Sequence, residues 1–94
     1  MKKRMVLVTT DKDCRGVFMG ELVSREGDTV VLKDAQNAVY WACDTHGVFG
    51  LASIGPQKGS RITPIVPQIE INHVTSISDC TPEAVEKWRK QLWD

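Results

Sequence analysis

The sequence predicts a mainly β fold, a small barrel of five strands followed by a single C-terminal α-helix. Short β-branched segments alternate with turn residues along most of the chain, and glycines interrupt the second of these segments. A helix-start pattern follows the last of them. The chain has 94 residues, enough for one hydrophobic core and too few for two. We therefore expect one domain over residues 1–94, with the barrel over 4–78 and the helix over 82–92.

Two strands open the predicted barrel, over residues 4–10 and 15–25. The first is rich in β-branched residues and contains neither glycine nor proline. In the second, apolar residues such as Phe18 and Met19 fall on opposite faces under strict alternation, so we expect this strand to be covered on both sides. Gly20 lies inside it and predicts a bend or bulge. A small, strongly curved barrel requires such a bend.

The next strands form a meander with short turns. Gly27 can adopt the positive φ of a tight turn, which predicts a hairpin with a return strand over 28–33. Asp34 and Asn37 suit a second turn, because their side chains bond readily to nearby backbone groups. A third consecutive strand is expected over 38–43.

The middle of the chain, residues 44–67, changes character. It holds four of the seven glycines and three of the four prolines, so we expect an irregular connection there. One or two helical turns are expected over 47–54, with Phe49, Leu51 and Ile54 reaching the core. A connection of this length inside a compact domain is usually functional or covered by a partner subunit.

One more strand and the helix complete the predicted fold. Residues 68–78 alternate well and predict a half-buried strand that contains His73. Thr81 can cap a helix, and Pro82 fits its first position. An apolar stripe of the helix should pack against the barrel or a neighbouring subunit, and its cations should form an ordinary solvated face. The stripe consists of Val85, Trp88 and Leu92, and the cations are Lys87, Arg89 and Lys90.

Charge and hydropathy exclude some classes of protein. Twelve Lys and Arg residues balance twelve Asp and Glu residues, and this neutrality argues against a protein that coats double-stranded DNA. No apolar run approaches the roughly 18 residues of a membrane span. The short apolar run near the start, residues 5–8, is too short for a signal-peptide core. We expect a cytoplasmic protein.

The three cysteines, Cys14, Cys43 and Cys80, are too widely spaced and too few for a disulfide framework. Cys43 and His46 form a C-x-x-H pair that His73, Cys14 or Cys80 could complete as a zinc site. Structural zinc sites usually show two such pairs, and this chain has one. We therefore predict no metal and no cofactor, with buried free thiols as the ordinary role of the cysteines.

Candidates for acid–base catalysis carry no recognisable pattern. They are His46, His73, Asp11, Asp13 and Asp44. His73 lies among isoleucines, where core-edge packing is the usual role, and Asp11 and Asp13 lie in an expected polar turn. No nucleophile elbow, phosphate-binding P-loop or paired metal motif is present. We predict that the protein is not an enzyme.

The loop over residues 55–61 has the composition of an anion-binding loop. Gly59 and its neighbours can point successive backbone N–H groups into one concavity, Ser60 can add its hydroxyl, and Lys58 and Arg61 add positive charge. The alternative is an ordinary surface loop that needs turn residues.

Tyr40 and Trp41 are adjacent on one predicted strand and therefore point to opposite faces. One should enter the core, and the other should face an interface or a ligand. Together with Phe49 they could stack on a nucleobase, while Lys58, Arg61 and Arg15 bind its phosphates. The alternative is that all the aromatic residues are core.

Two resemblances follow from these features. The five short strands with a curved second strand and a terminal helix resemble SH3-like and Sm-like small barrels. The segments RGVFMGEL, LKDAQNAVYW, GLASIGPQKGSR and CTPEAVEKW resemble a family of short uncharacterised phage and prophage proteins. This second resemblance implies a viral accessory protein, and it supplies no catalytic residues.

We expect a homo-oligomeric binding module without catalysis, because a domain this small buries little of its own surface. As a phage protein it would sequester a small anionic nucleotide-type ligand such as a host immune signal, in a pocket between subunits. One alternative is an Sm-like RNA- or protein-binding adaptor that uses the barrel edge and the cluster Lys2, Lys3 and Arg4. Another is a structural protein of the virion.

Overall fold

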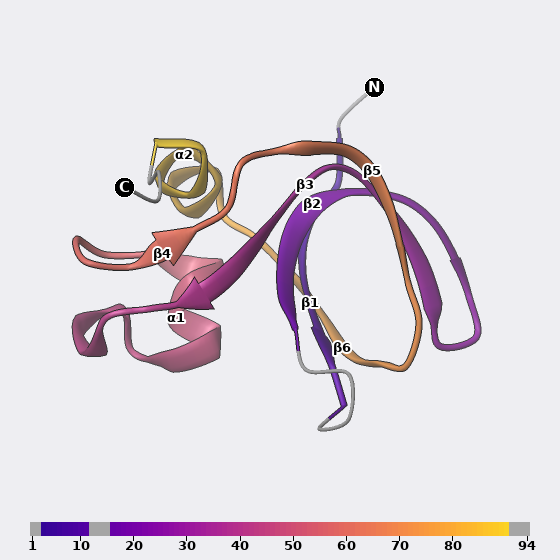
Figure 1. Cartoon of the computed structure of the whole chain (residues 1–94), viewed down its shortest axis with the longest axis horizontal. Coiled ribbons are helices and arrows are strands. Elements are labelled where there is room, and N and C mark those ends of the chain that lie inside the picture. The colour runs from indigo at the N-terminus through magenta and orange to yellow at the C-terminus, as the bar shows by residue number, and fades with distance from the viewer. Residues whose placement is uncertain (1–2, 12–15, 91–94) are drawn as a thin grey trace.

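The computed structural model describes residues 3–11 and 16–90, and of residue 44 only the backbone (Figure 1). Within these residues, six antiparallel strands form one sheet, and two short α-helices lie beside it. The strands are β1 (Met5–Thr10), β2 (Val17–Glu26), β3 (Thr29–Tyr40), β4 (Arg61–Ile62), β5 (Val66–Ile71) and β6 (Val74–Asp79). The helices are α1 (Gly47–Ser53) and α2 (Pro82–Lys90), and the 3-10 turn η2 (Cys43–Thr45) precedes α1.

The sheet is curled but open, which corrects the prediction of a closed five-stranded barrel. Its strand order is β4–β3–β2–β1–β6, and β5 pairs with the first part of β3. β5 and β6 follow each other directly, yet β5 pairs with β3 and β6 pairs with β1 (Figure 1). No ladder joins β5 to β6 among the described residues, so the two edges of the curled sheet do not close on each other.

The predicted turn around Asp34 is a bulge inside one long strand. Met19 pairs with Gln36 and Glu21 with Lys33, so β3 carries one residue more than β2 in this interval. Asp34 takes up the extra residue with φ +52°. Aspartate tolerates this left-handed conformation better than most residues, in bulges as well as in turns. Asp34 therefore adopts the positive φ that suits a turn, but the chain continues along the same strand instead of turning.

The predicted last strand is in fact two strands that are joined by a turn and pair with different partners. β5 ends before Asn72 and β6 begins after His73, which has φ +60°. His73 is therefore an exposed turn residue rather than a mid-strand residue among isoleucines. Alternation alone could not reveal the reversal, because Asn72 and His73 continue the polar–apolar pattern. β4, which pairs with the end of β3, was not predicted.

Several predicted elements are confirmed. β1 and β2 lie where two opening strands were expected. The predicted tight turn at Gly27 joins β2 to β3, and Gly27 has φ +61°. α1 occupies the predicted helical turns. α2 begins at Pro82, and the N–H of Ala84 donates to the Thr81 hydroxyl at 3.0 Å, which is the expected cap. The predicted end of this helix, including Leu92, lies outside the described residues.

Two apolar clusters stabilise the fold, one on each side of β1. Val6 and Val8 pack among the strands with Val30 and Leu32. Leu7 points the other way, into a cluster between the sheet and the two helices. β2 divides its side chains in the same manner, as the alternation of Phe18 and Met19 predicts: Phe18 joins the first cluster and Met19 the second.

The helices complete the second cluster. Trp88 of α2 is fully buried there, with Leu51 and Ala52 of α1 and Ile62 of β4. Its packing partner is therefore its own sheet. The prediction that Phe49 reaches the core is wrong, because its side chain is 78% exposed. α1 is only seven residues long, and its buried residues are Gly50, Leu51 and Ala52, so Phe49 lies outside its buried face.

Candidate functional site

The glycine-rich loop between α1 and β4 is held tightly against α2. Gly55 has φ +85°, a conformation that favours glycine. A Cβ atom added there would lie 2.7 Å from the Cβ of Lys87 and 3.1 Å from the Cα of Ala84. Only a residue without a side chain allows this approach. The loop therefore has a fixed position relative to the last turns of the helix.

Side-chain hydroxyls fix the rest of this loop. The N–H of Gln57 donates to Thr45 Oγ1 at 3.1 Å, and the N–H of Ala42 donates to Ser60 Oγ at 3.1 Å. The N–H of Ser60 also donates to the carbonyl of Gln57 at 3.1 Å. Ser60 and Thr45 are both buried. The hydroxyl of Ser60, a predicted ligand group, is thus engaged in holding the loop.

A cationic hollow lies between this loop and α2. It is lined by Pro56, Gln57, Lys58, Lys87 and Lys90, with a volume of about 220 Å³. We call it the lysine hollow. Lys58 was predicted as a ligand-binding residue, whereas Lys87 and Lys90 were expected to form an ordinary solvated face. Their spacing places Lys87 and Lys90 on one side of the helix, but no sequence signal pairs that side with the loop.

The charge around the lysine hollow is positive. Residues 45–69 contain two cations, Lys58 and Arg61, and no carboxylate. Lys90 Nζ lies 3.1 Å from Glu86 Oε1, and both side chains are largely exposed. The described lining holds three lysines and no carboxylate. A small anion would complement this charge.

A buried polar network sets the position of the helix. Gln36 is 2% exposed, and its Nε2 donates to the carbonyls of Thr63 and Trp88 at 3.1 and 3.2 Å. Its Oε1 accepts a hydrogen bond from Arg89 Nη1 at 2.8 Å. Burial lowers the pKa of Arg89, and the charge of Asp34 opposes that shift. Arg89 is therefore a structural residue, which corrects its assignment to the solvated face.

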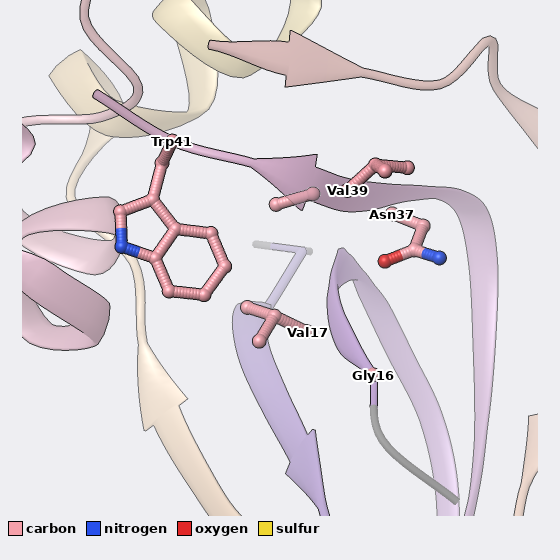
Figure 2. Close-up of a pocket in the computed structure, with 6 residues that line it drawn as sticks. Gly16, Val17, Asn37, Val39 and Trp41 are labelled. Atoms are coloured by element: carbon pink, nitrogen blue, oxygen red, sulfur yellow. The ribbon is translucent and has the colours of Figure 1, made fainter.

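A second hollow lies where β2 begins and β3 leaves it to pair with β4. It has a volume of about 340 Å³ and is lined by Gly16, Val17, Asn37, Ala38, Val39 and Trp41 (Figure 2). We call it the Trp41 hollow. The indole of Trp41 points into it and also packs against the cluster beneath the helices. Asn37, which was considered only as a turn residue, presents its carboxamide at the opposite end (Figure 2).

The structure separates the residues that the sequence grouped into one site. Lys58 lies at the lysine hollow and Trp41 at the Trp41 hollow, and the two hollows share no lining residue. Tyr40 does not line the Trp41 hollow; it is 53% exposed and pairs across the strands with Arg61. Gly59 is exposed, with φ +99°. Arg15 lies outside the described residues.

The possible metal ligands do not gather. Cys43 and His46 are both exposed at η2, and no group of three His, Cys, Asp or Glu residues capable of holding a metal is found among the described residues. Cys80 is half-buried, and burial followed by the charge of Asp79 raises the pKa of its thiol to about 12. Cys14 lies outside the described part of the chain.

The acid–base candidates are also dispersed. His73 Nδ1 lies 3.9 Å from Asp11 Oδ2, with both side chains substantially exposed. His46 follows the end of β3 and immediately precedes α1, whereas His73 lies near the start of β3. Asp13 and the side chain of Asp44 lie outside the part of the chain that the structure describes. In the part of the chain that is described, no helix is long and apolar enough to span a membrane.

Comparison with protein families assigns the chain. The model of a domain of unknown function, DUF6948, matches residues 3–88. The chain belongs to this family. The DUF6948 match includes the whole described sheet, the Trp41 hollow, and the lysine hollow except for Lys90. No curated protein and no solved structure matches the chain.

Proposed function

We propose that this DUF6948 protein is a non-enzymatic binding module for a small, phosphate-bearing ligand of the nucleotide class, held at the lysine hollow. The observation that carries the proposal is the convergence of Lys58 with Lys87 and Lys90 around one hollow. Ammonium groups donate charge-assisted hydrogen bonds to phosphate oxygens, and these are stronger than neutral ones. The three lysines of the described lining would complement the negative charge of a phosphate group.

Preorganisation supports the same proposal. Lys58 extends from a loop that is fixed by the Gly55 contact and by the hydroxyls of Thr45 and Ser60. Lys87 and Lys90 extend from a helix that Gln36 fixes. Ligand binding therefore requires little ordering of the backbone, and the cost of ordering is one of the main terms that oppose affinity.

The test is calorimetric titration with AMP at low ionic strength, using wild type, Lys87→Gln and Lys33→Gln. Lys33 is an exposed lysine on β3, so its substitution makes the same change in net charge away from the hollow. We expect Lys87→Gln to weaken AMP binding roughly tenfold, the worth of one hydrogen bond to a charged group. Lys33→Gln should leave affinity unchanged. Equal weakening by both variants, or no binding by wild type, would overturn the proposal.

Two further measurements test the character of the binding. Raising the salt concentration from about 50 to about 200 mM should weaken AMP binding, because exposed charges are screened. Recovery of AMP unchanged after incubation and protein removal is expected of a module without catalysis. Conversion of the nucleotide would show an enzyme instead.

Self-association completes the proposal. Five large apolar side chains between residues 39 and 66 are exposed, namely Val39, Tyr40, Phe49, Ile65 and Val66. Burial of Phe49 against a second copy would remove apolar surface from water. Native mass spectrometry should show an oligomer, and Phe49→Ser should shift it toward monomer. Val23→Ser, at an exposed valine of β2, is the matched control. A wild-type monomer would exclude this part.

The biological setting that we propose is a phage protein that sequesters a host nucleotide signal in the host cytoplasm. Its support is the resemblance of four sequence segments to phage proteins. The adaptor alternative is less favoured, because two of its cations already have acidic neighbours: Arg4 Nε lies 2.8 Å from Asp79 Oδ1, and Lys3 Nζ lies 4.0 Å from Glu21 Oε1. Lys2 lies outside the described residues. Preferential binding of single-stranded RNA over AMP would favour that alternative.

A further inference from the structure

The Trp41 hollow combines a flat aromatic wall with a polar end. Asn37 and Val39 lie two residues apart near the end of β3, Trp41 follows directly after the strand, and all three line the hollow. Val17 of β2 forms the facing wall, and Gly16 beside it carries no side chain (Figure 2). A side chain at Gly16 would collide with the ring of Phe18. Gly16 therefore leaves this part of the wall without a side chain.

The polar end is the carboxamide of Asn37. The backbone of this residue is already used, since its N–H donates to Thr63 Oγ1 at 2.9 Å and its carbonyl accepts from the N–H of Thr63 at 3.0 Å. No hydrogen bond between described residues uses the side chain. The carboxamide offers one acceptor and one donor side by side. That pair matches a ring edge that carries an adjacent donor and acceptor.

The described lining contains no charged side chain. Val17 and Val39 make the walls apolar, and the face of Trp41 offers a stacking surface. A phosphate would meet no charged partner among the described lining residues, whereas a neutral planar ring can stack and still bind through its edge. The occupant that fits is thus different from that of the lysine hollow.

We propose that the Trp41 hollow binds a nucleobase-type ring, with Trp41 stacking on the ring and Asn37 binding its donor–acceptor edge. Asparagine makes such a two-point contact with adenine, through the exocyclic amine and the neighbouring ring nitrogen. This inference goes beyond the proposed phosphate site. The two hollows share no residue, so either proposal can fail without the other.

The experiment is a nitrogen–proton NMR titration of the whole chain with adenosine, which carries a base and no phosphate. We expect shifts at the Trp41 indole N–H and the Asn37 carboxamide, and none at the indole of Trp88, which is buried in the core. Affinity should not depend on salt, because adenosine is neutral. Absence of shifts at Trp41, or shifts centred on Lys58 and Lys87, would overturn the inference.

Variants separate stacking from edge recognition. Trp41→Leu should weaken adenosine binding about tenfold or more, the worth of base stacking on an aromatic ring. Tyr40→Leu, at the adjacent residue, which does not line the hollow, should leave it unchanged. If Trp41→Leu does not fold, Val39→Met fills the hollow at a half-exposed position and should abolish binding. Binding that survives a folded Val39→Met protein would contradict the assignment.

Purine riboside tests the role of Asn37. It differs from adenosine by the lack of the exocyclic amine, so it can stack but cannot make the two-point contact. Asn37→Leu should weaken adenosine binding more than purine riboside binding, because purine riboside keeps the ring-nitrogen acceptor but lacks the amine donor. Equal effects on the two nucleosides would show that Asn37 does not read the ring edge.

Discussion

The indole Nε1 of Trp88 donates a hydrogen bond to the backbone carbonyl of Leu51 across 2.9 Å. Trp88 belongs to α2 and Leu51 to α1, and both are fully buried. The bond joins the two helices inside the cluster that they share with the sheet. It also satisfies a polar group that the core would otherwise leave without a partner.

Trp88→Phe should therefore lower the free energy of unfolding by about 2–4 kcal/mol, because it removes the bond, leaves the Leu51 carbonyl buried and opens a small void. Urea unfolding followed by circular dichroism measures the change. Trp41→Phe is the control, since it makes the same substitution at a tryptophan that is only partly buried, whereas the Leu51 carbonyl accepts its bond from Trp88. An equal loss in both variants would show that the hydrogen bond contributes little.

Gly55→Ala should both destabilise the protein and weaken AMP binding. The new Cβ would press on Lys87 and Ala84, and alanine would be held at positive φ. We expect a loss of about 1–3 kcal/mol in unfolding free energy. Gly59→Ala is the matched control in the same loop: φ is also positive there, but an added Cβ meets no atom within 4 Å. The difference between the variants isolates the contact with the helix. Identical results for both would contradict its importance.

Cys80 should make stability fall at alkaline pH. Its pKa is raised from an ordinary 9.0 to about 12, so the folded protein holds this proton more tightly than the unfolded chain does. The stabilising contribution is complete below pH 9 and is lost as the pH rises toward 12. Unfolding of wild type and Cys80→Ala should therefore be compared at pH 8 to 11. The difference between them should shrink with pH, and a constant difference would contradict the shift.

Local sequence patterns predicted much of the fold. The alternation of Phe18 and Met19, the positive φ of Gly27 and the cap of Thr81 each depend on a few neighbouring residues, and each was found in the structure. The predicted turn at Asp34 and the predicted continuous strand through His73 were wrong for the same reason. Asp34 and His73 both adopt positive φ, yet one continues its strand and the other reverses the chain. Pairing partners far along the chain decide which occurs, and local propensity does not contain them.

The candidate site shows the same division. Composition predicted an anion site at Lys58 and its glycine-rich loop, and Lys58 does line a hollow with two further lysines. The placement of Lys87 and Lys90 beside that loop depends on Gln36 and Gly55, which fix α2 through contacts made by residues distant in sequence.

The sequence by itself determined that this is a mainly β domain with a C-terminal helix, because alternation, turn residues and helix caps act over a few residues at a time. Only the tertiary structure decided that the curled sheet stays open and that Trp41 and Lys58 belong to different hollows. Those outcomes depend on strand register and on the packing of α2, which bring together residues that no local pattern relates.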